Sequence, residues 1–280
     1  MTGGEVNLPA TSQYPGNVVL IGAGKMGGAL LEGWIGLGVD PACIVAIEPQ
    51  PTAPIEALSA RGVRINPDSA SICPDAIVIA VKPQIAAEIM PSVASLMSPS
   101  TIVISIMAGR PIAFLAGALP HNAAVVRAMP NTPAAIGRGI TVAVANSLVS
   151  PVQRQLADGL LRAAGAVEWI DDEALMDAVT AVSGSGPAYV FLLAESLAHA
   201  GEKAGLPAEL AARLARATVA GSGELLHRSS IDAAVLRQNV TSPGGTTAAA
   251  LDVLMAPDGL DLLMERAIAA ATRRGRELAG

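Results

Sequence analysis

The chain contains few of the residues that mark specialised classes of protein. Its 280 residues include only two each of Trp, Tyr, Phe and Cys, although 51% are hydrophobic. A core with so few aromatic rings must be built from Ala, Val, Leu and Ile. Cys43 and Cys73 show no spacing typical of a zinc site or a disulfide framework, so neither is expected. This sparse cysteine usage favours a reducing compartment, and we expect a cytoplasmic protein.

Long apolar runs and basic clusters are also missing. No uninterrupted apolar stretch approaches the roughly 20 residues needed to cross a bilayer. The net charge is -6 and no basic run occurs, so neither nucleic acid nor a membrane is an expected partner. His121, His199 and His227 lack nucleophile partners and metal-ligand spacing, and no metal is expected. Residues 1–16 contain Gly and Pro without an apolar segment, which indicates a disordered lead-in and not a signal peptide.

Short apolar runs alternate with helical patterns over residues 17–170. The predicted strands are Val18–Ile21, Ile44–Ile47, Ala76–Val81, Thr101–Ile106, Ala123–Met129 and Thr141–Ala145. The predicted helices between them include Met26–Leu37, Ala53–Ala60, Ile85–Leu96 and Pro151–Ala163. Near-continuous apolar strands separated by helices indicate a mostly parallel sheet that is covered on both faces. We therefore expect an α/β class fold that begins with a Rossmann-like doubly wound domain.

The strand pattern ends after Asp171, and residues 171–280 show helical periodicity. The predicted helices are Ala174–Val182, Ala188–Ala204, Ala208–His227, Thr246–Met255 and Leu260–Leu278. Gly205-Leu206-Pro207 indicates a helix end followed by a new start. The apolar faces are wider than one small bundle can bury, so we expect an all-helical domain through which two subunits associate. A monomer whose helices dock on the sheet domain is the alternative.

A glycine-rich loop follows the first predicted strand. Gly22-Ala23-Gly24-Lys25-Met26-Gly27 has the Gly-x-Gly-x-x-Gly spacing and opens a predicted helix. The first Gly permits a tight turn, the second lets backbone N–H groups approach a pyrophosphate, and the third allows close helix packing. The spacing alone is a weak signal. The strand–turn–helix context favours a dinucleotide site over an ordinary flexible turn.

Glu48 follows the second predicted strand, about 20 residues after Gly27, as expected of the acidic residue that binds the adenosine ribose. Its carboxylate can accept from both ribose hydroxyls and would repel a 2′-phosphate. No Arg or Lys follows before Arg61, so a clamp for that phosphate is not visible. Glu48 therefore favours NADH weakly over NADPH. A solvated Glu at a strand end is the alternative.

Two further predicted strands run into candidate cofactor contacts at the carboxyl edge of the sheet, where such sheets bind ligands. One ends in Ala80-Val81-Lys82-Pro83, and the other is followed by Met107-Ala108. A lone Lys at such a place is more often a surface charge. The following Pro ends the strand and shifts the interpretation of Lys82 towards the cofactor.

Three later stretches, with the one around Lys82, resemble the recurrent motifs of the pyrroline-5-carboxylate reductase family. They are Met129-Pro130-Asn131-Thr132-Pro133, Ser183-Gly184-Ser185-Gly186-Pro187-Ala188-Tyr189 and Asn239-Val240-Thr241-Ser242-Pro243-Gly244-Gly245-Thr246-Thr247. The resemblance covers the chain from Asn17 to Leu278. It implies a Rossmann domain followed by a helical domain that interlocks two subunits, as a dimer or a ring of dimers.

The resemblance also implies the reaction, which is reduction of the cyclic imine 1-pyrroline-5-carboxylate to L-proline with hydride from NADH or NADPH. This chemistry needs two carbons aligned and a hydrogen-bond partner for the imine nitrogen. By resemblance, Thr247 is that partner. The resemblance further implies a composite active site. The cofactor would bind to the Rossmann domain of one subunit, and the imino acid would bind to helical elements that can belong to the partner.

The loop before the predicted helix Thr246–Met255 is a candidate site for the substrate carboxylate. Two glycines free its backbone to form a concave group of N–H donors at a helix start, although a plain capped turn would use the same residues. The resemblance implies a substrate set of Glu173, Val240, Ser242, Gly244, Gly245, Thr246 and Thr247. It adds Asn131 and Asn239 to the cofactor contacts. Glu173 and Asn239 can equally be helix caps.

The sequence departs from the family pattern at three places. Glu48-Pro49-Gln50 replaces a basic or hydroxyl residue that is frequent with NADPH. Asn66-Pro67-Asp68-Ser69 offers no clear match for an Asn that contacts the adenosine ribose. Ile106, followed by Met107, stands where the family frequently has a polar or small residue after the Ser of this strand, here Ser105. The first two departures bear on the choice of cofactor, and the third on packing beside the nicotinamide.

Two other functions remain open on sequence grounds. A hydroxyacid dehydrogenase or related imine reductase shares the layout, but hydroxyacid dehydrogenases of this kind use a Lys in the helical half. Lys203 is the only Lys after Lys82, and it lies at a predicted helix end. A non-enzymatic nucleotide-binding protein would not need Thr247 or the Pro-Gly-Gly loop.

Overall fold

The computed structural model describes residues 16–68 and 72–279. Nearly all of the predicted lead-in, residues 1–15, lies outside this part of the chain, as does Ser69. The chain divides into two compact units. The first comprises the residues up to Gly184 together with Arg273–Gly280, and the second comprises Ser185–Thr272.

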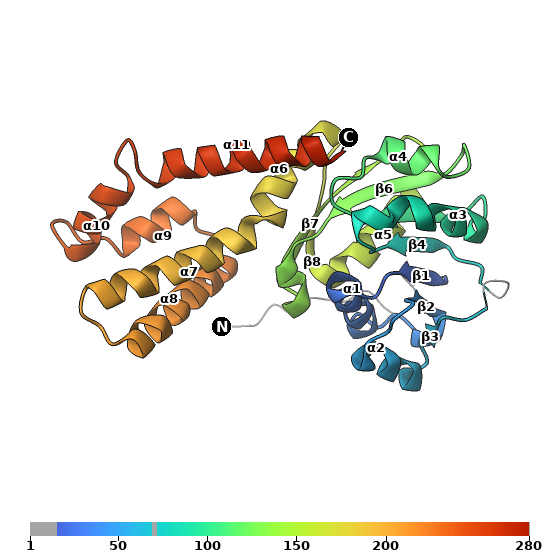
Figure 1. Cartoon of the computed structure of the whole chain (residues 1–280), viewed down its shortest axis with the longest axis horizontal. Coiled ribbons are helices and arrows are strands. Elements are labelled where there is room, and N and C mark those ends of the chain that lie inside the picture. Colours follow the sequence, from blue (N-terminus) through green and yellow to red (C-terminus); the bar gives the residue numbers. More distant parts are fainter. Residues whose placement is uncertain (1–15, 69–71, 280) are drawn as a thin grey trace. The chain divides into compact units, whose positions relative to one another are not determined.

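The first unit is built on a sheet. The described residues form one eight-stranded sheet in the order β3-β2-β1-β4-β5-β6-β7-β8 (Figure 1). The strands are β1 (Val18–Ile21), β2 (Ile44–Ile47), β3 (Arg64–Ile65), β4 (Ala76–Ile79), β5 (Ile102–Ser105), β6 (Ala124–Met129), β7 (Gly139–Ala145) and β8 (Gly165–Trp169). Strands β1 to β6 are mutually parallel, β7 is antiparallel to β6, and β8 is parallel to β7. The predicted mostly parallel, doubly wound sheet is confirmed.

Helices cover both faces of this sheet because its strands are apolar on both sides. Val18 and Leu20 of β1 belong to one buried cluster, and Val19 and Ile21 belong to the other. The helices of this unit are α1 (Lys25–Gly36), α2 (Ala53–Ala57), α3 (Ala86–Leu96), α4 (Ile112–Gly117), α5 (Pro151–Leu161) and α6 (Met176–Val179). A π-helical turn, Thr180–Gly184, follows α6.

Several predicted boundaries were wrong by a few residues. The fourth strand ends at Ile79, not Val81, so Ala80 and Val81 lie in the segment after it. Strands β3 and β8 were not predicted, because β3 has two residues and β8 includes Gly165 and Glu168. The short helix α4 was also not predicted.

The second unit is helical, as predicted. Its helices are α7 (Gly186–Lys203), α8 (Ala208–Arg228), α9 (Ala233–Asn239), α10 (Thr246–Leu254) and most of α11 (Leu260–Ala279). Helices α7 and α8 lie side by side, joined at Gly205, whose φ of 99° is left-handed. This confirms the predicted helix end and restart. Helix α9 was not predicted. Across the described residues, no helix combines the length and the apolar character needed to span a membrane.

Candidate functional site

The glycine loop lies at the point where the strand order reverses. The chain leaves β1 towards β2 and β3, then crosses to β4 on the other side of β1. Ligands of open α/β sheets bind outside the carboxyl ends of the strands at such a switch point. The loop after β1, residues 22–24, opens directly there, because α1 begins at Lys25.

The three glycines of the loop have different surroundings. Gly22 has a left-handed φ of 92°, and a Cβ there would lie 2.9 Å from the backbone of Ala80. A Cβ on Gly27 would collide with the carbonyl oxygen of Gly22. Gly24 is exposed, and a Cβ added to it would meet no described atom within 4 Å. The first and third glycines therefore serve packing, and the second leaves space for a ligand to approach the backbone.

The start of α1 is open to an anion. Gly24 is its N-cap residue, and within the described chain no side chain caps the first turn, which also contains no acidic residue. The unpaired N–H groups and the positive end of the helix dipole favour a phosphate at this position. Lys25 is exposed and Met26 is half-buried. These features fit the pyrophosphate of a dinucleotide.

The carboxylate of Glu48 lies against this loop. Its Oε2 accepts a hydrogen bond from the N–H of Ala23 at 2.8 Å, and its Oε1 accepts from the N–H of Gln50 at 3.1 Å. Asn66 holds the Glu48 backbone from both sides: its side chain accepts from the Glu48 N–H at 2.9 Å and donates to the Glu48 carbonyl at 2.8 Å. The structure thus brings Glu48 and the glycine loop together.

The segments after β4 and β5 are joined by an arginine. The guanidinium of Arg110 donates to the carbonyl of Pro83 through Nε at 3.2 Å and Nη2 at 2.9 Å. Its Cζ also lies 4.9 Å from the ring centroid of Phe114. The predicted cofactor contacts Lys82–Pro83 and Met107–Ala108 therefore lie on two connected segments. Met107 is buried, whereas Lys82 and Ala108 are exposed.

Asn131 follows β6 and is tied to its own unit. Its Oδ1 accepts from the N–H of Ile140 at 3.0 Å, and its Nδ2 lies 3.3 Å from the Oγ of Ser183. Ser183 belongs to the π-helical turn, and such turns are frequent at functional sites. The Met129–Pro133 and Ser183–Tyr189 motifs thus meet at this hydrogen bond.

Glu173 forms the most buried ion pair of the first unit among the described residues. Its Oε1 accepts from Nη1 of Arg127 at 2.8 Å and from the N–H of Ile112 at 2.8 Å. The side chain of Arg127 is 6% exposed and that of Glu173 is 30% exposed. Glu173 lies in the 3-10 turn before α6, on the same unit as the glycine loop.

The remaining predicted residues belong to the second unit. Asn239 is the last residue of α9, Val240 is 70% exposed, and Thr246 begins α10. The loop between the helices turns at Gly244, whose φ is 69°, and the N–H of Gly245 donates to the carbonyl of Ser242 at 3.0 Å. Gly245 is the N-cap residue of α10. Thr247 is half-buried in the first turn.

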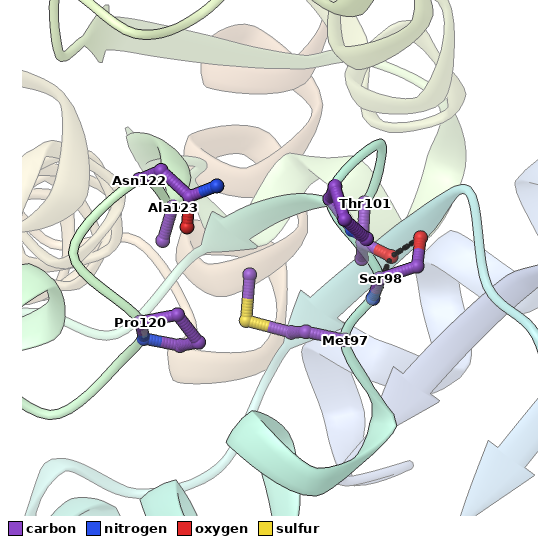
Figure 2. A pocket seen from close by; sticks show the side chains of 7 residues that line it. Met97, Ser98, Thr101, Pro120, Asn122 and Ala123 are labelled. Atoms are coloured by element: carbon purple, nitrogen blue, oxygen red, sulfur yellow. Dashed lines mark hydrogen bonds between the residues drawn. The ribbon is translucent and has the colours of Figure 1, made fainter.

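The first unit has one hollow beside the glycine loop and another at the opposite edge of the sheet. One of about 730 Å³ adjoins the glycine loop and is bordered by Gly24, Lys25, Thr52, Ile55 and Ala134. The other, of about 140 Å³, lies among Met97, Ser98, Thr101, Pro120, Asn122 and Ala123 (Figure 2). Thr101 and Ala123 come directly before β5 and β6, so the small hollow is at the amino edge of the sheet. It is therefore separate from the loops at the carboxyl edge.

Sequence reasoning assigned no role to Arg110 or Arg127, and it named Asn66 only within a stretch that has no clear match for the family's ribose-contacting Asn. A lone Arg inside the apolar run Ala123–Met129 was a usable signal, because a charged residue in a buried strand requires a partner. Arg110 and Asn66 act through backbone carbonyls or amides whose positions depend on the fold. No group of three or more His, Cys, Asp or Glu that could hold a metal occurs among residues 16–68 and 72–279.

Comparison with known proteins matches both parts of the chain to family models. Residues 173–278 match the pyrroline-5-carboxylate reductase dimerisation domain. Residues 17–109 match a domain described as NADP oxidoreductase, coenzyme F420-dependent.

Similarity to individual proteins extends over nearly the whole chain. Pyrroline-5-carboxylate reductase from Pseudomonas aeruginosa is 41% identical over 94% of this chain and 96% of its own length. The enzyme of that name from Synechocystis is 40% identical over 92% and 97%. The solved pyrroline-5-carboxylate reductase of Coxiella burnetii is 34% identical, with a TM-score of 0.85 over 95% of this chain and 99% of that chain. The Plasmodium falciparum enzyme, solved with NADP bound, is 29% identical, with a TM-score of 0.79 and the same coverage.

Proposed function

Because this chain belongs to the pyrroline-5-carboxylate reductase family, we propose that it reduces 1-pyrroline-5-carboxylate to L-proline with NADH or NADPH, the last step of proline biosynthesis. The observation that carries this conclusion is 41% identity to a reductase of that name over 94% of the chain. Similarity in the two-part layout along the whole length supports the same reaction. The hydroxyacid dehydrogenase alternative lacks a suitable Lys, since Lys203 is the last residue of α7.

The cofactor is proposed to bind the first unit. The open N-terminus of α1 and the space at Gly24 suit the pyrophosphate. The proposed contacts are Gly22, Ala23, Gly24, Lys25, Met26, Gly27, Glu48, Ala80, Val81, Lys82, Pro83, Met107, Ala108 and Asn131, with Asn239 from the second unit. When bound, the reduced nicotinamide would supply a hydride to the imine carbon, and a proton that the imine nitrogen already carries or takes from solvent completes the amine.

Glu48 supports a preference for NADH. Its carboxylate is held at the loop by the N–H groups of Ala23 and Gln50, and Asn66 fixes its backbone. A 2′-phosphate on the ribose would approach this fixed negative charge. The family contains an enzyme solved with NADP, so the preference is a property proposed for this chain and its Glu48.

The imino acid is proposed to bind at the loop before α10. Ser242, Gly244 and Thr246 are exposed residues at or before the start of α10, where no side chain caps the helix among the described residues, and backbone N–H groups at the positive end of a helix suit the substrate carboxylate. The hydroxyl of Thr247 would donate to or accept from the imine nitrogen. Val240 and Gly245 would add two further substrate contacts from the predicted set. This role requires no ionisable side chain on α10.

The protein carries the family's dimerisation domain, and we propose that it acts as a dimer or a ring of dimers. Helices α7, α9 and α10 contain no buried residue among those described, and α8 buries only Ala211 and Ala215. A second copy would cover these apolar faces. The two cysteines are free, which suits the reducing cytoplasm that the proposal assigns to the reaction.

The direct test is an assay of the purified protein with 1-pyrroline-5-carboxylate and either NADH or NADPH. We expect the imine to drive cofactor oxidation and L-proline to accumulate in equal amount. If neither cofactor is consumed while a hydroxyacid supports NAD reduction, the chain is a hydroxyacid dehydrogenase. Cofactor binding without turnover of either substrate would favour a nucleotide-binding protein without this activity.

A further inference from the structure

A single carboxylate oxygen connects three elements of the first unit. Oε1 of Glu173, in the 3-10 turn before α6, accepts from Arg127 on β6 and from the N–H of Ile112 at the start of α4, each at 2.8 Å. The guanidinium of Arg127 is nearly inaccessible, with its side chain 6% exposed. A buried cation needs a charged partner, so loss of the Glu173 carboxylate would leave the guanidinium of Arg127 buried without its counter-charge.

The two donors to Glu173 flank the segment Ile106–Pro111, which joins β5 to α4. Ile112 comes directly after this segment. Arg127 is paired in the sheet with Ser105, the residue directly before it. Glu173 is therefore connected to the end of the segment by a hydrogen bond and to its beginning through a neighbouring strand.

Further hydrogen bonds hold the same segment to the ends of β5 and β4. The Oγ of Ser105 accepts from the N–H of Met107 at 3.3 Å and holds the first turn after β5. Arg110 donates twice to the carbonyl of Pro83, at 3.2 and 2.9 Å, and so links the segment to the end of β4. Met107 and Ala108, the proposed cofactor contacts, lie between these supports.

We propose that Glu173 is a positioning residue that holds the segment Ile106–Pro111 in place for the nicotinamide half of the cofactor, and is not a ligand of the imine substrate. This inference rests on the proposed function, in which Met107 and Ala108 are cofactor contacts, and on the resemblance, which implies that Met107 packs beside the nicotinamide. Replacing the carboxylate removes the counter-charge of Arg127 and weakens the anchor at Ile112. The hydrogen bonds of Glu173 given above do not reach the contacts proposed for the pyrophosphate, at Gly22–Gly27, or for the adenosine ribose, at Glu48.

The test compares two ligands that differ in the nicotinamide. Glu173→Gln keeps the shape of the side chain and removes its charge. We expect its affinity for ADP-ribose, measured by calorimetry, to stay within about twofold of the wild type. Its affinity for NADH should fall on the order of tenfold to a hundredfold, and its turnover number should fall as well, as expected when a reacting group is misplaced. Glu168→Gln, at an exposed position on β8, is the matched control and should change neither.

A second variant covers the case in which Glu173→Gln does not fold. Arg110→Gln removes the link to Pro83 from a half-buried position and should give the same selective loss of NADH over ADP-ribose, of smaller size. Thermal unfolding of each variant is measured beside the binding. A lower melting temperature with unchanged discrimination between the two ligands would overturn the inference, because a purely structural role predicts it.

Other outcomes separate this inference from the proposed function. A higher KM for the imine in Glu173→Gln, with both nucleotide affinities unchanged, would make Glu173 a substrate ligand and refute the positioning role. If the wild-type protein binds NADH and ADP-ribose but does not reduce the imine, only the proposed function is refuted. The comparison of the two ligands then still decides the role of Glu173. If the wild-type protein binds neither nucleotide, the proposed function and the positioning role of Glu173 are both refuted.

Discussion

The two units of this chain bury apolar side chains to different extents. In the sheet unit, large side chains such as Trp34, Leu20 and Ile104 are completely or almost completely inaccessible. In the helical unit, Phe191 is 68% exposed, Leu225 is also 68% exposed, and the buried residues of α7 to α10 are two alanines. The sheet unit contains its own core within one chain. The helices α7 to α10 carry many apolar side chains and leave nearly all of them exposed or half-buried among the described residues.

The proposed cofactor site and the proposed imino-acid site also differ in the contacts that hold them in place. The cofactor segments are held by contacts inside one unit, such as Arg110 with Pro83 and Glu48 with Ala23. The loop before α10 is held by hydrogen bonds to its near neighbours in the chain, such as the N–H of Gly245 to the carbonyl of Ser242 and the hydroxyl of Thr241 to the carbonyl of Arg237. Subunit association is therefore expected to matter more for the imino acid than for the cofactor.

The largest effect is expected from a charge placed among the exposed apolar side chains of the helical unit. Phe191→Glu should dissociate the dimer, since a buried aromatic at an interface centre is typically worth at least about 2 kcal/mol. Imine reduction should be lost with it. Analytical ultracentrifugation and the reductase assay measure both effects. Val152→Glu is the matched control, because Val152 is 76% exposed on α5 of the sheet unit and should leave the mass unchanged. A dimeric, active Phe191→Glu would show that this face is not the interface.

A second prediction concerns the loop of the helical unit. Thr247→Ala should lower turnover on the order of a hundredfold, the size typical of losing a hydrogen bond aimed at the reacting group. The affinity for NADH should not change, because the glycine loop belongs to the other unit. Steady-state kinetics and nucleotide calorimetry separate the two quantities. Thr247→Ser keeps the hydroxyl and should retain most of the activity. Unchanged turnover in Thr247→Ala would remove this residue from the mechanism.

A third prediction separates packing from ligand space in the sheet unit. Gly27→Ala should reduce the free energy of unfolding by about 1–3 kcal/mol, as overpacking does, because its Cβ would collide with Gly22. It should also weaken NADH binding. Gly24→Ala meets open space, so NADH binding should weaken with a smaller change in stability. Chemical denaturation and calorimetry provide the two measurements. Equal destabilisation by both changes would contradict the different roles of these glycines.

The smallest expected effect concerns the choice between cofactors. Glu48→Ala should shift the ratio of kcat/KM values for NADH and NADPH towards NADPH by about tenfold, equal to roughly 1.4 kcal/mol. The reason is the loss of a fixed negative charge near the ribose. Gln50→Ala leaves that charge in place and serves as the control. An unchanged ratio in Glu48→Ala would mean that this carboxylate serves only the backbone of Ala23 and Gln50.

Local sequence patterns were enough to predict that a sheet domain is followed by a helical domain. Apolar strands without alternation require a sheet buried on both faces, and the helical period after Asp171 requires a different kind of layer. The Gly22–Gly27 spacing identified the loop at the switch point. This motif depends on residues that are close together in the chain, so it can be recognised before the fold is known. The motif from Asn239 to Thr247 likewise identified the family through residues adjacent in sequence.

Which distant groups meet became visible only in the folded chain. Arg127 and Glu173 are 46 residues apart and form one ion pair, while Arg110 reaches a carbonyl 27 residues away. The short strand β3 and helix α4 form because neighbouring elements supply their contacts, which local propensity does not record. The partners of a side chain depend on strand order and register, so the sequence named Glu173 as a functional residue while the fold showed which groups it holds.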